Sequence, residues 1–157
     1  RRPAARNEKV PMPAPAMTAE EIVALMRAGF EGFDRTGIGV EAVDHRFARL
    51  RLKVTSRSLR IGGTVSGPAM FMLADTAFFV AVLASVGPEA LAVTTQMSIN
   101  FLKKPPAVDL VAECRLLKLG SRLAVGEVTL FSEGDAEPVA HATGSYSIPP
   151  KREIAAA

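Results

Sequence analysis

The sequence is poor in the residues that build disulfides, metal sites and serine triads. Among its 157 residues there is one cysteine, Cys114, which excludes an internal disulfide and fits a reducing compartment such as the cytoplasm. The two histidines, His45 and His141, stand alone, whereas a metal site needs several ligands at a recognisable spacing. No G-x-S-x-G motif marks a serine nucleophile. We therefore expect no metal and no cofactor.

The excess of positive over negative charge is also small. The net charge is +3, and part of the excess lies in the first six residues, RRPAAR. That is too little and too local for a nucleic-acid-binding protein, although it is compatible with an anionic small molecule. Residues 1–17 contain four prolines and lack the apolar core of a signal peptide, so we expect a disordered leader. The remainder should form one domain over 18–149, followed by a frayed tail at 150–157.

One stretch, residues 62–87, dominates the sequence with the run GGTVSGPAMFMLADTAFFVAVLASVG. Pro68 suits the first turn of a helix and Gly87-Pro88 suits its end, which predicts a helix over 68–86. A helix that is apolar on all sides must be enclosed by other elements. A carboxylate in its middle, Asp75, is costly unless it is paired, hydrated or used in chemistry. Asp75 and the near-minimal length argue against a membrane span, so we expect a buried core helix and no membrane partner.

The other segments show the patterns of one short helix and several strands. Thr18 and Glu21 form a capping-box pattern, which predicts a helix over 19–31. Short turns after residue 108 predict that the last three strands form an antiparallel meander. The sequence therefore predicts an α+β hotdog fold, in which an antiparallel sheet of about five to six strands wraps around one long central apolar helix. Period-two alternation predicts the strands over 43–54, 91–102, 108–119, 122–132 and 138–148.

These patterns resemble a known family. A Gly-containing turn, an apolar helix that bears an acid and a following strand, AVTTQMSINFL, are similar to the PaaI-like acyl-CoA thioesterases of the hotdog superfamily, over about residues 40–148. In that family a His-Gly-Gly turn opens the helix, and an Asp or Glu follows nine residues after the His. Here Ser66-Gly67-Pro68 occupies the turn, and Asp75 follows nine residues after Ser66. Because Ser66 and Pro68 depart from the pattern, a non-catalytic protein that binds acyl-CoA or aromatic ligands is the alternative.

The resemblance implies hydrolysis of an acyl- or aryl-CoA thioester to a free acid and CoA. The backbone N–H of Gly67 would polarise the thioester carbonyl, and Asp75 would act as general base or nucleophile. Thr94 is the nearest match to a polar strand residue that positions water. Ser66, Pro68 and Thr95 would lie against the substrate. A free N–H group at a helix start suits developing negative charge, which agrees with these roles.

Several basic residues are candidates for contacts with anionic parts of such a substrate. Arg60 lies six residues before Ser66, near where some relatives carry a polar amide. It either binds a carboxylate or phosphate, or is a solvated loop arginine. Lys103, Lys104 and Arg122 lie at predicted strand ends and turns, where they either meet the phosphates of CoA or are solvated charges.

The spacing of Gly67 and Asp75 bears on the assembly. They are eight residues apart, which is about 12 Å along a helix at 1.5 Å per residue. One chain's pair could hardly hold both a carbonyl and the attacking water. Two chains with antiparallel helices could, and active sites of the resembled family lie at such dimer interfaces. We therefore expect a homodimer, assembled further as a dimer of dimers, that binds a CoA thioester.

Overall fold

The structure, a computed structural model, describes residues 11–151. Most of the predicted leader (residues 1–10) and most of the predicted tail (residues 152–157) lie outside the described residues. The two helices are α1 (Ala19–Gly29) and α2 (Gly67–Val86), with short 3-10 turns η1 (Phe33–Thr36) and η2 (Ser56–Ser58). The strands are β1 (Ile38–Asp44), β2 (Phe47–Leu52), β3 (Val93–Phe101), β4 (Leu110–Leu119), β5 (Leu123–Ser132) and β6 (Pro138–Ser147).

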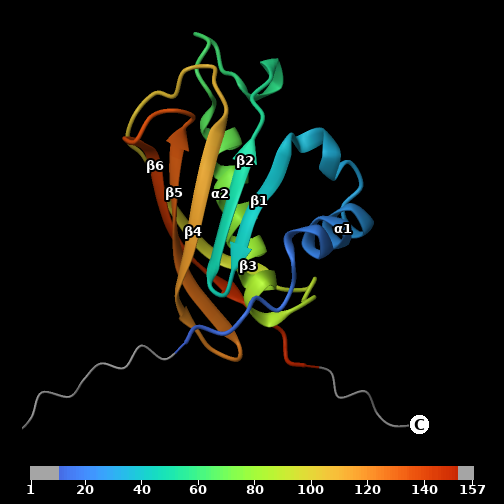
Figure 1. The fold of residues 1–157 in the computed structure, drawn as a ribbon. Helices are drawn as coiled ribbons and strands as arrows, with labels where there is room; N and C mark the ends of the chain where they lie inside the picture. The colour runs from blue at the N-terminus through green and yellow to red at the C-terminus, as the bar shows by residue number, and fades with distance from the viewer. Residues whose placement is uncertain (1–10, 152–157) are drawn as a thin grey trace, which may run out of the picture.

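The six strands form one antiparallel sheet that curves around α2 (Figure 1). Their order across the sheet is β1-β2-β4-β5-β6-β3. The adjacent pairs β4–β5 and β5–β6 confirm the predicted meander, and β3 returns to the far edge beside β6. This arrangement confirms the α+β hotdog fold.

Helix α2 begins and ends where its local sequence predicts. Ser66 is the N-cap, and its Oγ accepts a hydrogen bond from the Ala69 N–H at 3.3 Å. Pro68 occupies the first turn, where its missing N–H costs nothing. Gly87 ends the helix, and its N–H donates to the Leu83 carbonyl. By length and composition α2 could cross a membrane, but the sheet packs against it and about half of its residues are buried in the domain, so α2 is the core helix.

The predicted single strand over 43–54 is wrong, because two strands occupy this region. β1 and β2 form a hairpin in which Asp44 pairs with Phe47, so His45 and Arg46 make the turn. Arg46 has a positive φ of 62°, a conformation that usually favours Gly or Asn. The turn therefore contains no glycine that would mark it in the sequence. From Phe47 onward the predicted period-two alternation is present, with the side chains of β2 alternating between half-buried and buried.

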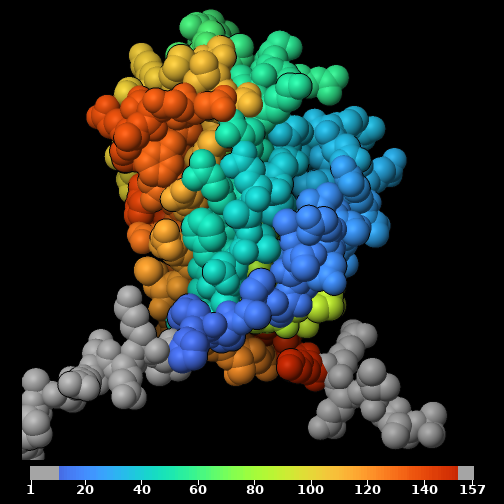
Figure 2. Space-filling model, in the orientation of Figure 1, coloured from blue at the N-terminus to red at the C-terminus, as the bar shows by residue number. Residues whose placement is uncertain are grey.

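The segment that leads into α1 contacts the C-terminal end of α2. The Ala16 N–H donates to the Ala84 carbonyl at 2.7 Å, and the Met17 side chain is buried. Figure 2 shows this blue segment crossing the bottom of the molecule. α1 itself has the predicted capping box between Thr18 and Glu21. Residues 16 and 17 therefore belong to the packed domain.

Candidate functional site

Asp75 lies in the middle of α2 and is half-buried. Two hydroxyl groups donate to the same carboxylate oxygen, Oδ1. The Thr94 hydroxyl lies 2.6 Å from it, and the Tyr146 hydroxyl also lies 2.6 Å from it. Distances of 2.5–2.7 Å are typical of hydrogen bonds from a hydroxyl to an ionised carboxylate. The Asp75 carboxylate of α2 is thus held by hydrogen bonds from two strands of the sheet, β3 and β6.

A bulge in β3 decides which threonine reaches Asp75. The pairing of β3 with β6 shifts between Thr94 and Gln96, so simple alternation breaks at this point. Thr94 turns toward α2. Thr95, predicted to lie against the substrate, is exposed instead, and its hydroxyl contacts the hydroxyl and carbonyl of Ser145. The structure therefore places Thr94 in the site and Thr95 away from it.

Tyr146 contacts Asp75 but was not among the site residues predicted from the sequence. It is the single tyrosine of the chain and is 3% exposed. Its ring stacks on Phe78, with centroids 4.8 Å apart. Burial, and then the hydrogen bond with Asp75, raise the pKa of Tyr146, so its hydroxyl stays protonated and donates. The available signal was that a buried tyrosine hydroxyl needs a polar partner.

Asp75 opens onto a cavity of about 440 Å³. Met26 of α1, Phe79 of α2 and Val93 of β3 form its apolar wall. Among the described residues, Asp75 is the only charged side chain that lines it. The cavity therefore combines an apolar surface with one oriented carboxylate.

Gly67 stands at the first position of α2, where backbone N–H groups lack intrahelical partners. The next donors are used or missing: Pro68 has no N–H, Ser66 Oγ accepts from Ala69, and the Ser66 carbonyl accepts from the Met70 N–H at 3.1 Å. Within residues 11–151, no acceptor pairs with the Gly67 N–H. The Ser66 side chain is thus taken up by capping, while Gly67 keeps a free donor at the positive end of the helix.

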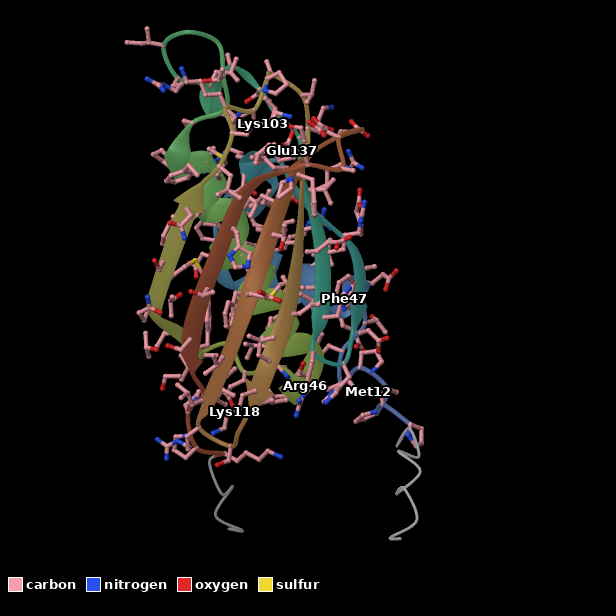
Figure 3. All side chains as sticks on the ribbon, turned by 90° about the vertical axis from the view of Figure 1, so that its left-hand side faces the viewer. Met12, Arg46, Phe47, Lys103, Lys118 and Glu137 are labelled. Atoms are coloured by element: carbon pink, nitrogen blue, oxygen red, sulfur yellow. The ribbon has the colours of Figure 1, made fainter. Side chains whose placement is uncertain are left out.

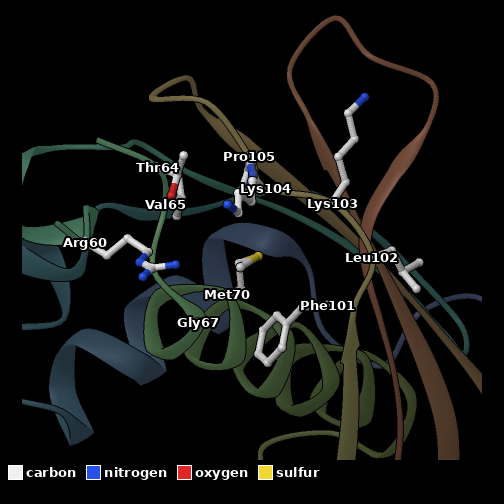
Figure 4. Close-up of a pocket in the computed structure, with 10 residues that line it drawn as sticks. All are labelled: Arg60, Thr64, Val65, Gly67, Met70, Phe101, Leu102, Lys103, Lys104 and Pro105. Carbon is white, nitrogen blue, oxygen red and sulfur yellow. The ribbon is translucent and has the colours of Figure 1, made fainter. Parts of the chain in front are cut away.

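Gly67 lines a second cavity, of about 360 Å³, shown in Figure 4. Arg60 and Lys104 lie beside it, above Met70 and Phe101. This cavity therefore joins a helix N-terminus to two basic side chains.

Two other predicted basic residues are engaged elsewhere. Lys103 belongs to the same rim, but its ammonium group lies 2.7 Å from Asp135 and 3.1 Å from Glu137. Figure 3 shows Lys103 beside Glu137, and in Figure 4 its side chain points away from Gly67. Arg122 lies beyond the C-terminal end of α2, where its Nε donates to the Ile148 carbonyl at 3.2 Å. The structure does not bring Arg122 together with Arg60 and Lys104.

Residues 62–139 match the sequence model of the thioesterase superfamily. A crystal structure from Silicibacter sp. TM1040, described as a "putative thioesterase", is 45% identical; the match covers 87% of this chain and 94% of that one, with a TM-score of 0.79. A "putative esterase" of Saccharolobus solfataricus is 28% identical over 134 residues, which is 85% of this chain and 87% of that one. The PaaI protein of E. coli, from the phenylacetic acid degradation operon, shares the fold with a TM-score of 0.73 at 24% identity, over 83% of this chain and 93% of that one.

The matched segment contains the features described above: α2 with Gly67 and Asp75, and β3 with Thr94. The identity and coverage of the Silicibacter structure extend the likeness over most of the chain. The chain therefore belongs to the thioesterase superfamily, and it is a thioester hydrolase of the PaaI-like, hotdog kind.

Proposed function

We propose that this protein hydrolyses an acyl- or aryl-CoA thioester to a free acid and CoA, at a site shared by two chains. Asp75 of one chain acts as general base or nucleophile, and the Gly67 N–H of the other polarises the thioester carbonyl. The observation that carries the proposal is the Asp75 carboxylate, which two hydroxyls hold at the edge of an apolar cavity.

The chemistry follows from the charges that develop. Attack on the carbonyl carbon moves negative charge to the carbonyl oxygen, which the Gly67 N–H stabilises at the positive end of α2. With Asp75 as base, the carboxylate takes a proton from water while the water oxygen bonds to the carbonyl carbon. The C–S bond then breaks, and the CoA sulfur leaves as thiolate and receives that proton. As nucleophile, an Asp75 oxygen would bond to the carbonyl carbon while the C–S bond breaks and CoA thiolate leaves, which gives a mixed anhydride. Water would then open the anhydride, release the acid, regenerate the Asp75 carboxylate and supply the proton that the thiolate takes up.

A second copy of the chain is supported by the surface around Asp75. In the part of the chain that the structure describes, β3 pairs with β6 alone and leaves its other edge open. Exposed apolar side chains flank this edge and the adjoining face of α2: Phe71, Met72, Val93, Phe101 and Leu102. Such a surface is typical of an interface. Joining two chains there fits the spacing of Gly67 and Asp75, while a dimer of dimers stays a prediction.

The two cavities suggest a division of the substrate. Met26, Phe79 and Val93 would contact the acyl or aryl group, since apolar walls favour apolar ligands. Arg60 and Lys104 would contact phosphate groups of CoA. A CoA thioester substrate and the buried free thiol of Cys114 both agree with an enzyme of the cytoplasm, where thiols stay reduced.

The test is turnover of purified protein on a panel of short, long and aromatic acyl-CoA substrates, with released CoA thiol as the signal. Asp75→Asn should lower kcat by about a hundredfold or more, because the base is lost while the shape is kept. Asp34→Asn is the control, since Asp34 is an exposed carboxylate that pairs with Arg27. Tight binding of acyl-CoA in calorimetry, with no turnover of any substrate, would establish the non-catalytic alternative instead.

A further inference from the structure

Tyr146 contacts Asp75 but has no step in the chemistry above. We propose that Tyr146 is a positioning residue, which together with Thr94 holds Oδ1 of Asp75 and leaves Oδ2 as the oxygen that acts on water or thioester. This inference rests on the proposed function. Thr94 then acts through Asp75 and does not itself hold the attacking water.

The two oxygens of the Asp75 carboxylate have different hydrogen-bond partners. Each hydroxyl has one proton to donate, and both donate to Oδ1 at 2.6 Å. The Tyr146 hydroxyl also lies 3.1 Å from the Asp75 carbonyl, a longer contact to a neutral acceptor. No residue between 11 and 151 donates to Oδ2. Oδ2 is therefore the oxygen available for substrate.

The two hydroxyl groups come from paired positions on adjacent strands of the sheet. Thr94 of β3 and Tyr146 of β6 are paired across neighbouring strands, directly before the bulge. Phe78 packs against the Tyr146 ring with an interplanar angle of 14°, and Phe79 lies behind it at a centroid distance of 6.2 Å. A buried ring stacked in this way cannot swing its hydroxyl toward solvent. The carboxylate is therefore held by two groups that are themselves fixed, which is what a preorganised site requires.

The surroundings of Asp75 allow its two hydrogen bonds to be tested by experiment. The groups that face it across the cavity are uncharged: Met26 of α1, Thr76 and Phe79 of α2, Ala92 before β3, and Val93 of β3. Within residues 11–151, removing one of the two hydroxyls therefore changes the contacts of the one charged side chain that lines this cavity. The chain also has no tryptophan and a single tyrosine, so its absorption at wavelengths beyond the phenylalanine bands reports on Tyr146 alone.

The kinetic test compares Tyr146→Phe and Thr94→Val with wild type. Phenylalanine keeps the stacked ring, so the fold should persist, which thermal unfolding checks. Loss of one hydrogen bond to a charged group should lower kcat by about ten- to a hundredfold with KM little changed. Thr143→Val, an exposed threonine on β6, is the control.

The spectroscopic test uses Tyr146 itself as the probe. In Asp75→Asn the carboxylate is gone, so the tyrosine absorption band should shift to shorter wavelength, while Asp34→Asn should leave it unchanged. An unchanged band in Asp75→Asn overturns the inference, as does an active wild type whose kcat survives Tyr146→Phe. If wild type hydrolyses no CoA thioester, the proposed function fails and this inference falls with it.

Discussion

Gly67 and Asp75 lie on the same helix but line different cavities. Their separation of eight residues is about 12 Å along α2. In the proposed function, the free N–H of Gly67 and the oriented carboxylate of Asp75 belong to one site, and one chain cannot bring both groups to a single carbonyl. A partner whose α2 runs antiparallel would bring the two groups together from different chains, and this relationship leads to the first two predictions.

Removing the Gly67 N–H should lower the rate more than adding a side chain at the same position does. Gly67→Pro does this, because proline is favoured at the first helical position and Ser66 already has the extended backbone that proline requires before it. We expect a fall in kcat of about a hundredfold or more, as for other oxyanion donors. Gly67→Ala is the matched control, since it keeps the N–H and its Cβ would lie 3.4 Å from the Phe101 ring, an ordinary contact. Equal rates for the two variants would show that this N–H does not meet the substrate.

Mixing two inactive variants should restore activity. Gly67→Pro and Asp75→Asn each spoil both sites of a homodimer. After joint unfolding and refolding at equal amounts, a mixed dimer combines the intact Gly67 of one chain with the intact Asp75 of the other. We expect about a quarter of the wild-type rate, because half of the dimers are mixed and each has one good site of two. A mixture as inactive as its parents would mean that both groups serve the site within one chain.

Of the two lysines at the rim of the Gly67 cavity, Lys104 should contribute more to the binding of CoA substrates than Lys103. Lys104→Ala and Arg60→Ala should each raise KM for CoA substrates by about two- to tenfold with kcat unchanged, because they remove binding that is equal in ground and transition states. Lys103→Ala should change KM less, since Asp135 and Glu137 already pair with that ammonium group. The KM increase should shrink at high salt as the charges are screened. A larger effect at Lys103 than at Lys104 would contradict this reading.

The parts of this structure that were predictable from sequence are those governed by neighbouring residues. Ser66, Pro68 and Gly87 bound α2 through capping, and the apolar run between them requires enclosure by a sheet. Asp75 stands out in this run because a carboxylate in an apolar helix is costly unless it is paired, hydrated or used in chemistry. Local chemistry thus located α2 and marked Asp75, while the role predicted for Gly67 came from the family resemblance.

The parts that were not predictable depend on contacts between distant segments. Tyr146 meets Asp75 across 71 positions of sequence, and no local pattern marks such a pair. The choice between Thr94 and Thr95 depends on a bulge that alternation cannot show. The β1–β2 turn escaped notice because Arg46 adopts a left-handed backbone without glycine or asparagine.

The bulge itself should depend on Gly144 of β6, where β3 approaches too closely for a side chain. A Cβ at Gly144 would lie 2.6 Å from the Gln96 carbonyl oxygen and 3.3 Å from the Met97 Cα. Gly144→Ala must therefore push β3 away, and with it the Thr94 hydroxyl. We expect a loss of about 1–3 kcal/mol in the free energy of unfolding, as for other overpacked sites, and a fall in kcat.

Gly39→Ala in β1 is the matched control for this prediction, because a Cβ there meets nothing within 4 Å and its backbone is not left-handed. That change should be neutral or slightly stabilising, since alanine restricts the unfolded chain. Urea unfolding at one fixed protein concentration, followed by the single tyrosine, measures both variants under the same association equilibrium. If Gly144→Ala unfolds at the same urea concentration as Gly39→Ala and keeps its rate, then β3 can move without disturbing Asp75, and the proposed role of the Thr94–Tyr146 pair loses its structural basis.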